Sequence, residues 1–375
     1  MSIPNIPTEE FSPRRLTVAR QRREFTKKDL AGAVNVTAQM VTFYEDGRHT
    51  PEVATARRIA EALDFPLAFF YGDEVDTIPL EAISFRSRRA MTAKVRDKTT
   101  ASGEVAACIV SPALARRFRL PVPAVPDLNG ETPEVAAQVL RAQWGLGQAP
   151  VTNVVHLLES VGVQIYWFEE ESPFVDAVSF WRDVQPFVLL SQRSRGGERA
   201  RFDLSHELGH LVLHRRVEDM DGQQVENEAD RFASSFLMPA DQFRSECPKF
   251  PTLNQLLNMK ERWKVSLQAM VRRCRDTSIL SQWQYECAFR QISTNGWRVQ
   301  EPGKLDWETS AIHKQVLDRL VDKRVYPEDL ARDVHLTVRE LAAYIPTINE
   351  YRQAIQEETP QRYLTIDELG YSANY

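Results

Sequence analysis

The motif HELGH at positions 206–210 constrains this chain of 375 residues more than any other feature. It lies within an apolar, helix-compatible stretch, FDLSHELGHLVLH. On a helix, two histidines four positions apart share one face and can bind one zinc ion. Glu207 adjoins His206, so it can act as general base toward the water that such a metal activates. The motif therefore predicts a helix over about 199–214, with His206 and His210 as metal ligands and Glu207 as the catalytic residue.

A catalytic zinc ion takes three protein ligands and keeps one open position. A second expected helix, over about 225–237, carries Glu226, Glu228 and Asp230. Glu226 and Asp230 are one turn apart, so we predict Glu226 as the third ligand and Asp230 as the hydrogen-bond partner of a ligand histidine. Glu228 points away from Glu226 on that helix, so only one of the two can be the ligand. His214 is an alternative ligand, although a partly exposed histidine at a helix end is the favoured interpretation.

Residues 11–72 predict a compact set of short helices. Pro13 after Ser12 suits a helix start, while Thr26 and Thr37 can cap helices over 27–34 and up to about Tyr44. This spacing is typical of a helix-turn-helix, in which the second helix of the motif enters the major groove. The residues expected to face DNA bases are Thr37, Ala38, Gln39, Thr42 and Phe43. The residues expected to contact phosphates are Arg20, Arg22, Arg23, Lys27, Lys28 and Arg48.

Charge is distributed unevenly along the chain, whose formal net charge is −5. Residues 11–60 contain ten Lys/Arg and five Asp/Glu, a balance of +5, and residues 84–119 contain nine and two, a balance of +7. A basic N-terminal region followed by an acidic remainder is typical of a DNA-binding protein built from separate domains. Basic and polar residues followed by PVPAVPDLNGETP predict a linker region over 73–130.

The remaining chain predicts two further domains. Helices near 133–144 and after 199, with strands over 163–168 and a hairpin over 178–191, indicate a domain at 131–300. Residues 305–375 predict a helical domain in which 316–345 has helix-turn-helix spacing. Mixed charge there favours a packing or dimerisation bundle over a second DNA-binding unit. The expected fold class is multidomain α+β: an all-α N-terminal helix-turn-helix, a central α/β domain that carries the HELGH motif, and a C-terminal helical tail.

The sequence also indicates a compartment. No window approaches the roughly 18 apolar residues of a membrane span, and the N-terminus lacks the pattern of a signal peptide. A cytoplasmic protein without membrane contact is expected. Its four scattered cysteines form no CxxC pair, so we expect buried thiols rather than disulfides or a thiolate metal site.

Two family resemblances follow from these motifs. LAGAVNVTAQMVTFYEDGRHTPEVATARRIAEAL, residues 30–63, resembles the XRE/Cro-repressor-like helix-turn-helix family, which implies a homodimer on a double-stranded DNA operator. ARFDLSHELGHLVLH with ENEADRFASSFLMP resembles the ImmA/IrrE family of metallopeptidases, over about 135–290. That resemblance implies that the central domain is a zincin-like α/β metallopeptidase domain, with a gluzincin-type site on His206, His210 and Glu226 and with Glu207 as catalytic residue. It also implies cleavage of a repressor under stress, as expected of a bacterial or phage-type regulator.

The expected cofactor is one Zn²⁺ per chain, since imidazole with one carboxylate favours zinc, although Mn²⁺ can replace it. The expected function is a DNA-binding regulator with a zinc endopeptidase. Its substrate is either a partner repressor or its own linker around 84–126, because flexible segments enter protease clefts. The alternative is a non-proteolytic or antitoxin-like regulator whose zincin-like domain is a sensor for a ligand, single-stranded DNA or a partner. A digestive peptidase would have no use for residues 11–72.

Overall fold

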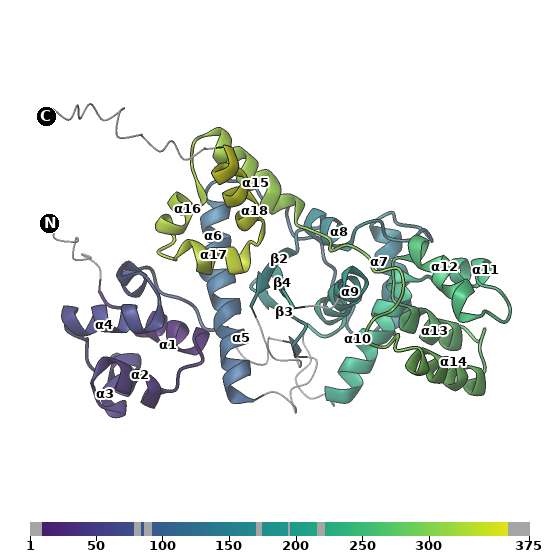
Figure 1. Cartoon of the computed structure of the whole chain (residues 1–375), viewed down its shortest axis with the longest axis horizontal. Helices are drawn as coiled ribbons and strands as arrows, with labels where there is room; N and C mark the ends of the chain where they lie inside the picture. The colour runs from purple at the N-terminus through teal and green to yellow at the C-terminus, as the bar shows by residue number, and fades with distance from the viewer. Residues whose placement is uncertain are drawn as a thin grey trace, which may run out of the picture.

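The computed structural model describes residues 10–78, 84–85, 92–169, 175–193, 196–215 and 222–358. Its centre is a four-stranded sheet with the order β1-β3-β4-β2, enclosed by helices (Figure 1). β3 and β4 form the expected antiparallel hairpin, β2 runs parallel to β4, and β1 pairs antiparallel with β3. The strands are β1 (Ser84–Phe85), β2 (Gln164–Phe168), β3 (Ala177–Arg182) and β4 (Gln185–Ser191).

The three longer strands are apolar on both faces. Successive side chains of a strand point to opposite sides, so β2 directs Tyr166 and Phe168 to one face and Ile165 and Trp167 to the other. These two pairs belong to two separate hydrophobic cores. A sheet of this kind needs a helical layer on each side, and the chain supplies both.

The N-terminal helices match the predicted helix-turn-helix closely. The side chains of Ser12, Thr26 and Thr37 each accept a hydrogen bond from a backbone N–H of the helix that follows. The fourth helix begins at Val53, after Glu52. The elements are α1 (Pro13–Arg22), α2 (Lys27–Val34), α3 (Ala38–Glu45), α4 (Val53–Leu63) and the 3-10 helix η1 (Leu67–Tyr71).

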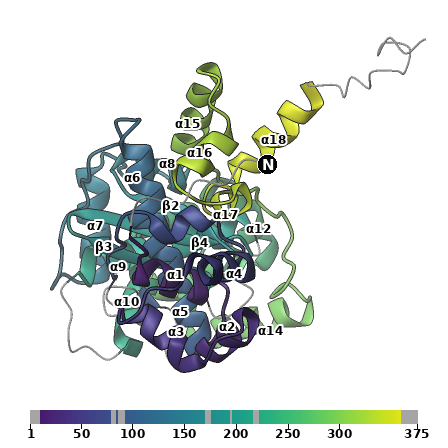
Figure 2. The ribbon, with the colours of Figure 1, turned by 90° about the vertical axis from the view of Figure 1, so that its left-hand side faces the viewer.

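The middle of the region predicted as a linker, residues 73–130, is a buried helix. It consists of α5 (Ala93–Val105), a π-helical turn η3 (Ala106–Val110) and α6 (Ser111–Ala115). Pro112 has no N–H to donate to the carbonyl four residues earlier, which accounts for the altered turn before it. This long helix stands between the N-terminal helices and the sheet, as Figures 1 and 2 show. At Gly103 it approaches the sheet so closely that a Cβ would lie 3.2 Å from the ring of Phe180.

The opposite face of the sheet is covered by α9, which contacts β3 and β4, and by α8, which contacts β2. The long helix α10 packs against α9 on the side away from the sheet. After α10 the chain forms four further helices before the C-terminal helices. The helices of this region are α7 (Pro133–Gln143), α8 (Val154–Ser160), α9 (Gly197–Leu213), α10 (Gly222–Leu237), α11 (Ala240–Glu246), α12 (Leu253–Trp263), α13 (Leu267–Asp276) and α14 (Gln282–Thr294).

The C-terminal helices return to the first face of the sheet, at the upper end of α6 in Figure 1. They are α15 (Ala311–Asp322), α16 (Pro327–Asp333), α17 (Val338–Tyr344) and α18 (Thr347–Glu358). α17 packs against β2 and buries residues 340–344. The second half of this helix is thus used for packing within the chain, while Arg339 in its first turn is exposed.

A buried ion-pair network joins α17 to the N-terminal helices. Arg22 Nε donates to Glu340 Oε1 at 2.8 Å and to the Tyr344 hydroxyl at 3.1 Å. Arg23 Nη1 donates to Glu340 Oε2 at 2.6 Å. The two guanidinium groups hold the pKa of Glu340 below its usual range, although burial acts in the opposite direction and is the largest single influence. The tail thus ties the helix-turn-helix to the central sheet.

Within the described residues, no helix is both long and apolar enough to cross a bilayer.

Candidate metal centre and nucleic-acid interface

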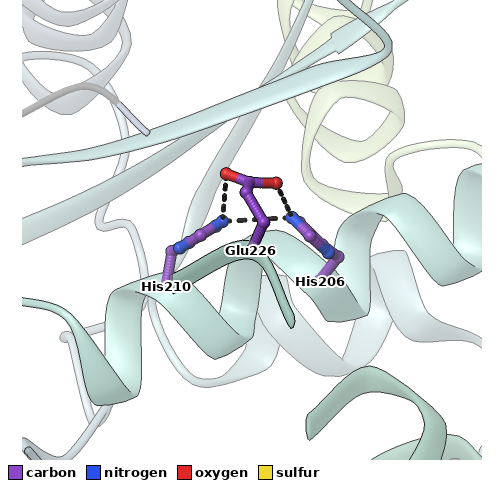
Figure 3. A group of neighbouring side chains, drawn as sticks. All are labelled: His206, His210 and Glu226. Carbon is purple, nitrogen blue, oxygen red and sulfur yellow. Dashed lines mark hydrogen bonds and ion pairs between the residues drawn. The ribbon is translucent and has the colours of Figure 1, made fainter. Parts of the chain in front are cut away.

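Three side chains from two helices converge on one point (Figure 3). α9 presents His206 and His210, one turn apart, and α10 brings Glu226 opposite them. The two Nε2 atoms lie 3.0 Å apart. Glu226 Oε2 lies 3.3 Å from Nε2 of His206, and Oε1 lies 3.6 Å from Nε2 of His210. The structure therefore brings together the three residues that the sequence predicts as ligands.

Gly209 makes this convergence possible. A Cβ at this position would lie 3.1 Å from the ring of Phe232 and 3.2 Å from the Cα of Ala229, both on α10. Any larger residue would push α10 away from α9 and withdraw Glu226 from the histidines. The glycine of the HELGH motif thus sets the distance between the two helices that supply the ligands.

The residues fit a divalent metal ion. The ligand atoms of His206, His210 and Glu226 all lie within 4.8 Å of one another, and two imidazoles with one carboxylate form a set that zinc prefers. Glu226 Oε2 is buried without a hydrogen-bond partner of good geometry. Burial lowers the pKa of His206, but the nearby carboxylates of Asp230, Glu226 and Glu207 outweigh it and raise the pKa to about 9. A divalent cation bound here would balance the negative charge of these carboxylates.

Each ligand histidine has a partner for its second ring nitrogen. His206 Nδ1 lies 2.9 Å from Asp230 Oδ1, as the sequence predicts. His210 Nδ1 lies 3.0 Å from Nδ1 of His214, whose Nε2 lies 3.0 Å from Glu228 Oε2. With a metal on Nε2, His210 donates to His214 and His214 donates to Glu228. The structure thus places His214 and Glu228 behind His210, outside the ligand group.

Glu207 lies beside the ligands and is fully buried. Ser179 on β3 donates a hydrogen bond from Oγ to Glu207 Oε2 at 2.6 Å. Burial raises the pKa of Glu207 to about 7, against the opposing charge of His206 and the hydrogen bond from Ser179. A carboxyl group whose pKa is close to neutral can both accept and return a proton. Ser179 leaves the second carboxylate oxygen, Oε1, for that exchange.

The face expected to read DNA bases is in part exposed. Thr37, Ala38 and Gln39 at the start of α3 are open to solvent, whereas Thr42 and Phe43 are half-buried. α3 lies on the outer side of the N-terminal helices, away from the sheet (Figures 1 and 2). The side chains at the first turn of this helix are therefore available to a ligand.

The expected phosphate contacts divide into two groups. Lys28 and Arg48 are exposed, and Lys27 is half-buried at 3.3 Å from Glu45. Arg48 lies over the ring of Phe43, with its guanidinium carbon 5.7 Å from the ring centre, and 3.4 Å from Asp46.

The other three arginines lie in internal ion pairs instead of facing solvent. Arg20 is buried and pairs with Glu45, while Arg22 and Arg23 pair with Glu340. A count of basic residues along the sequence could not detect partners so far away in the chain. These three side chains are therefore engaged in ion pairs within the chain.

Comparison with known families supports both halves of this description. Residues 18–70 match the helix-turn-helix family. Residues 158–275 match the family described as the IrrE N-terminal-like domain, a peptidase family. Comparison with curated proteins gives no match. The chain thus joins an XRE-type helix-turn-helix to an IrrE/ImmA-like domain of the metallopeptidase type, in the α+β multidomain arrangement predicted from the sequence.

Sequence reasoning missed Ser179 and did not assign a partner to His214. Ser179 is one polar residue in an apolar strand, and only the packing of β3 on α9 shows that it faces Glu207. Glu228 is the alternative to Glu226 as a metal ligand in the sequence. In the structure its Oε2 contacts Nε2 of His214 instead.

Substitution of Asp230 by alanine should weaken zinc binding, because this carboxylate orients His206. Loss of such a partner typically reduces metal affinity by about 10–100-fold. Competition with a chromophoric chelator measures the affinity. The control is Arg272→Ala, which removes the cation 3.4 Å from the other oxygen of Asp230 and should change the affinity little. Equal affinities for wild type and Asp230→Ala would contradict the orienting role.

Proposed function

We propose that the chain is a DNA-binding regulator whose central domain is a zinc-dependent endopeptidase. The observation that carries the proposal is the group of His206, His210 and Glu226 with Glu207 beside it, held by Ser179. A zinc ion on those three ligands would supply a Lewis acid for a peptide carbonyl and a water molecule. The Glu226 side chain is 20% exposed, so the group borders solvent on the side of α10.

The chain's own residues would perform the proton transfers. Glu207 accepts a proton from the attacking water through its free oxygen and passes it to the leaving amine. Ser179 keeps the other oxygen in place, so that the carboxylate does not rotate between the two transfers. Asp230 and the His214–Glu228 pair keep both imidazoles in the tautomer that leaves Nε2 for the metal.

The presence of a helix-turn-helix favours cleavage of a regulatory protein over unselective digestion of proteins. We propose that the substrate is a repressor protein, a partner or this chain itself, and that cleavage responds to stress. We further propose that the exposed first turn of α3 reads an operator, with Lys28 and Arg48 on phosphates. The resemblance to Cro-like repressors favours a homodimer on double-stranded DNA in the cytoplasm.

Substitution of Glu207 by glutamine should abolish most peptide cleavage while zinc remains bound. Loss of a general acid–base residue costs about 10²–10⁴-fold in rate. Hydrolysis of a mixed peptide library by the zinc-loaded chain, followed by mass spectrometry, measures it. The matched control is Glu246→Gln on α11, an ion-paired glutamate at the far end of the domain, which should retain the wild-type rate. A zinc-loaded wild type that cleaves no peptide would leave the sensor alternative.

Substitution of Lys28 by alanine should reduce the salt dependence of DNA binding. Each lost phosphate contact lowers the slope of log affinity against log salt by about 1. Titration of labelled double-stranded DNA at several salt concentrations measures the slope. Lys249→Ala, an exposed lysine after α11, should leave it unchanged. Gln39→Ala should alter sequence preference without changing the slope, and identical slopes for Lys28→Ala and wild type would contradict the proposed interface.

A further inference from the structure

Two cysteine side chains that are far apart in the sequence meet in the core of the central domain. Cys247 follows the last turn of α11 and Cys274 lies on α13, and their Sγ atoms are 3.7 Å apart. Both are free thiols, as the sequence predicts, and both belong to the hydrophobic core that includes α9 and α10. The fold thus creates a pair of thiols that no CxxC spacing announces.

The geometry allows the two sulfur atoms to join. A disulfide bond places its sulfur atoms about 2.05 Å apart, so the two Sγ atoms need to approach each other by roughly 1.6 Å. Cys247 can supply this movement because it has left the helical conformation, with φ −79° and ψ 129°. It begins the connection between α11 and α12, whereas Cys274 is held within α13.

The two thiols differ in accessibility and acidity. Cys274 is fully buried, whereas Cys247 is 8% exposed at the helix end, between the half-buried residues Glu246 and Pro248. The hydrogen bond between the thiols holds the pKa of Cys247 below its usual range and, together with burial, raises the pKa of Cys274. A thiolate rather than a thiol is the nucleophile. Cys247 is therefore the residue that reacts first with a reagent from solvent.

An arginine lies at the joint between the two helices. Arg244 is one turn before Cys247 on α11, and its Nε donates to the carbonyl of Thr277 at 3.0 Å. Thr277 follows Cys274 by three residues, so the guanidinium group connects the two helix ends that carry the thiols. Residues three apart on a helix are neighbours, and a nearby positive charge favours the thiolate form of a cysteine.

We infer that Cys247 and Cys274 are a modification site at which a hydroperoxide forms a disulfide bond. The thiolate of Cys247 attacks one peroxide oxygen, so that an S–O bond forms and the O–O bond breaks. The leaving oxygen takes the proton that the Cys247 thiol released. The sulfur of Cys274 then attacks the resulting sulfenic acid, an S–S bond forms, and the oxygen leaves as water with the Cys274 proton. The two thiols together lose two electrons and two protons, which the peroxide gains.

The bond would strengthen the support of the helix that carries Glu226. Arg273, beside Cys274, donates to the carbonyl of Met238 at 2.8 Å and to Ser235 Oγ at 3.1 Å, at the end of α10. A disulfide would tie this support to α11 and close a loop around α12. A cross-link stabilises a fold mainly by restricting the unfolded chain. The domain would thus record exposure to an oxidant as a covalent increase in stability, whether or not its metal site cleaves peptides.

The experiment oxidises the full-length chain with hydrogen peroxide under native conditions. A variant with Cys108→Ser and Cys287→Ser retains only the proposed pair. We expect its intact mass to fall by two hydrogen atoms, and alkylation in denaturant to find no thiol until a dithiol reductant is added. The midpoint of thermal unfolding should rise by several degrees on oxidation. Peptide mapping of the oxidised wild type identifies the same bond without any substitution.

Two single variants of that background test the order of the steps. Cys274→Ser removes the second thiol, so Cys247 should stop as a sulfenic acid that a cyclic dione reagent captures. Cys247→Ser leaves only the fully buried Cys274, which should stay a thiol over the same period. A sulfenic acid that forms on Cys274 as fast as on Cys247 would contradict the assigned order.

The outcomes separate this inference from the proposed function. Gain of oxygen atoms without a cross-link, a bond between two chains, or unchanged alkylation of both thiols would overturn the inference, even if the chain cleaves peptides. A cross-linked chain that retains zinc but cleaves no peptide, before or after oxidation, would support the inference and overturn the peptidase proposal. Neither cysteine is a metal ligand, so the zinc content should be the same in both redox states.

Discussion

The strands β2, β3 and β4 carry apolar side chains on both faces, and the structure depends on covering both. Each fully buried phenylalanine stabilises the fold by roughly 1.5–3 kcal/mol relative to an exposed one, and Phe168, Phe180 and Phe187 all lie on the face opposite α9. α9 covers one face together with α8, and α10 packs against α9, so that α9 and α10 carry the metal site. The other face needs α5–α6 and the C-terminal helices, which bring the N-terminal helices into the same core.

The helix-turn-helix is for this reason an integral part of the structure, although its sequence reads as a separate domain. Arg22 and Glu340 are both almost completely buried, and loss of one partner of such a pair leaves an uncompensated charge at a cost of about 3–5 kcal/mol. α17 contacts β2 on one side and holds Arg22 and Arg23 on the other. A change at the sheet can therefore reach the DNA-binding helices through a single short helix.

Features that depend on local sequence could be predicted, and those that depend on distant partners could not. Capping residues such as Thr26 and Thr37 determine the helix starts from their own neighbours, and helical spacing brings His206 and His210 together. The ion-pair partners of Arg20, Arg22 and Arg23 lie elsewhere in the chain, so the local sequence predicts that these arginines are exposed. The region that contains α5 and α6 is predicted as a linker because its first part is basic and its last part is rich in proline. The burial of its middle is visible only in the structure. β1 is too short to show the alternation that marks a strand.

The metal content of the purified full-length chain tests the metal centre most directly. Elemental mass spectrometry after zinc exposure and removal of loose metal should find about one zinc per wild-type chain, the stoichiometry of one closed group of three ligands. His206→Ala should lose the metal, and Glu207→Gln should keep it because Glu207 lies outside the ligand group. A wild-type chain that retains no zinc, or a His206→Ala chain that retains as much as the wild type, would contradict the site formed by His206, His210 and Glu226.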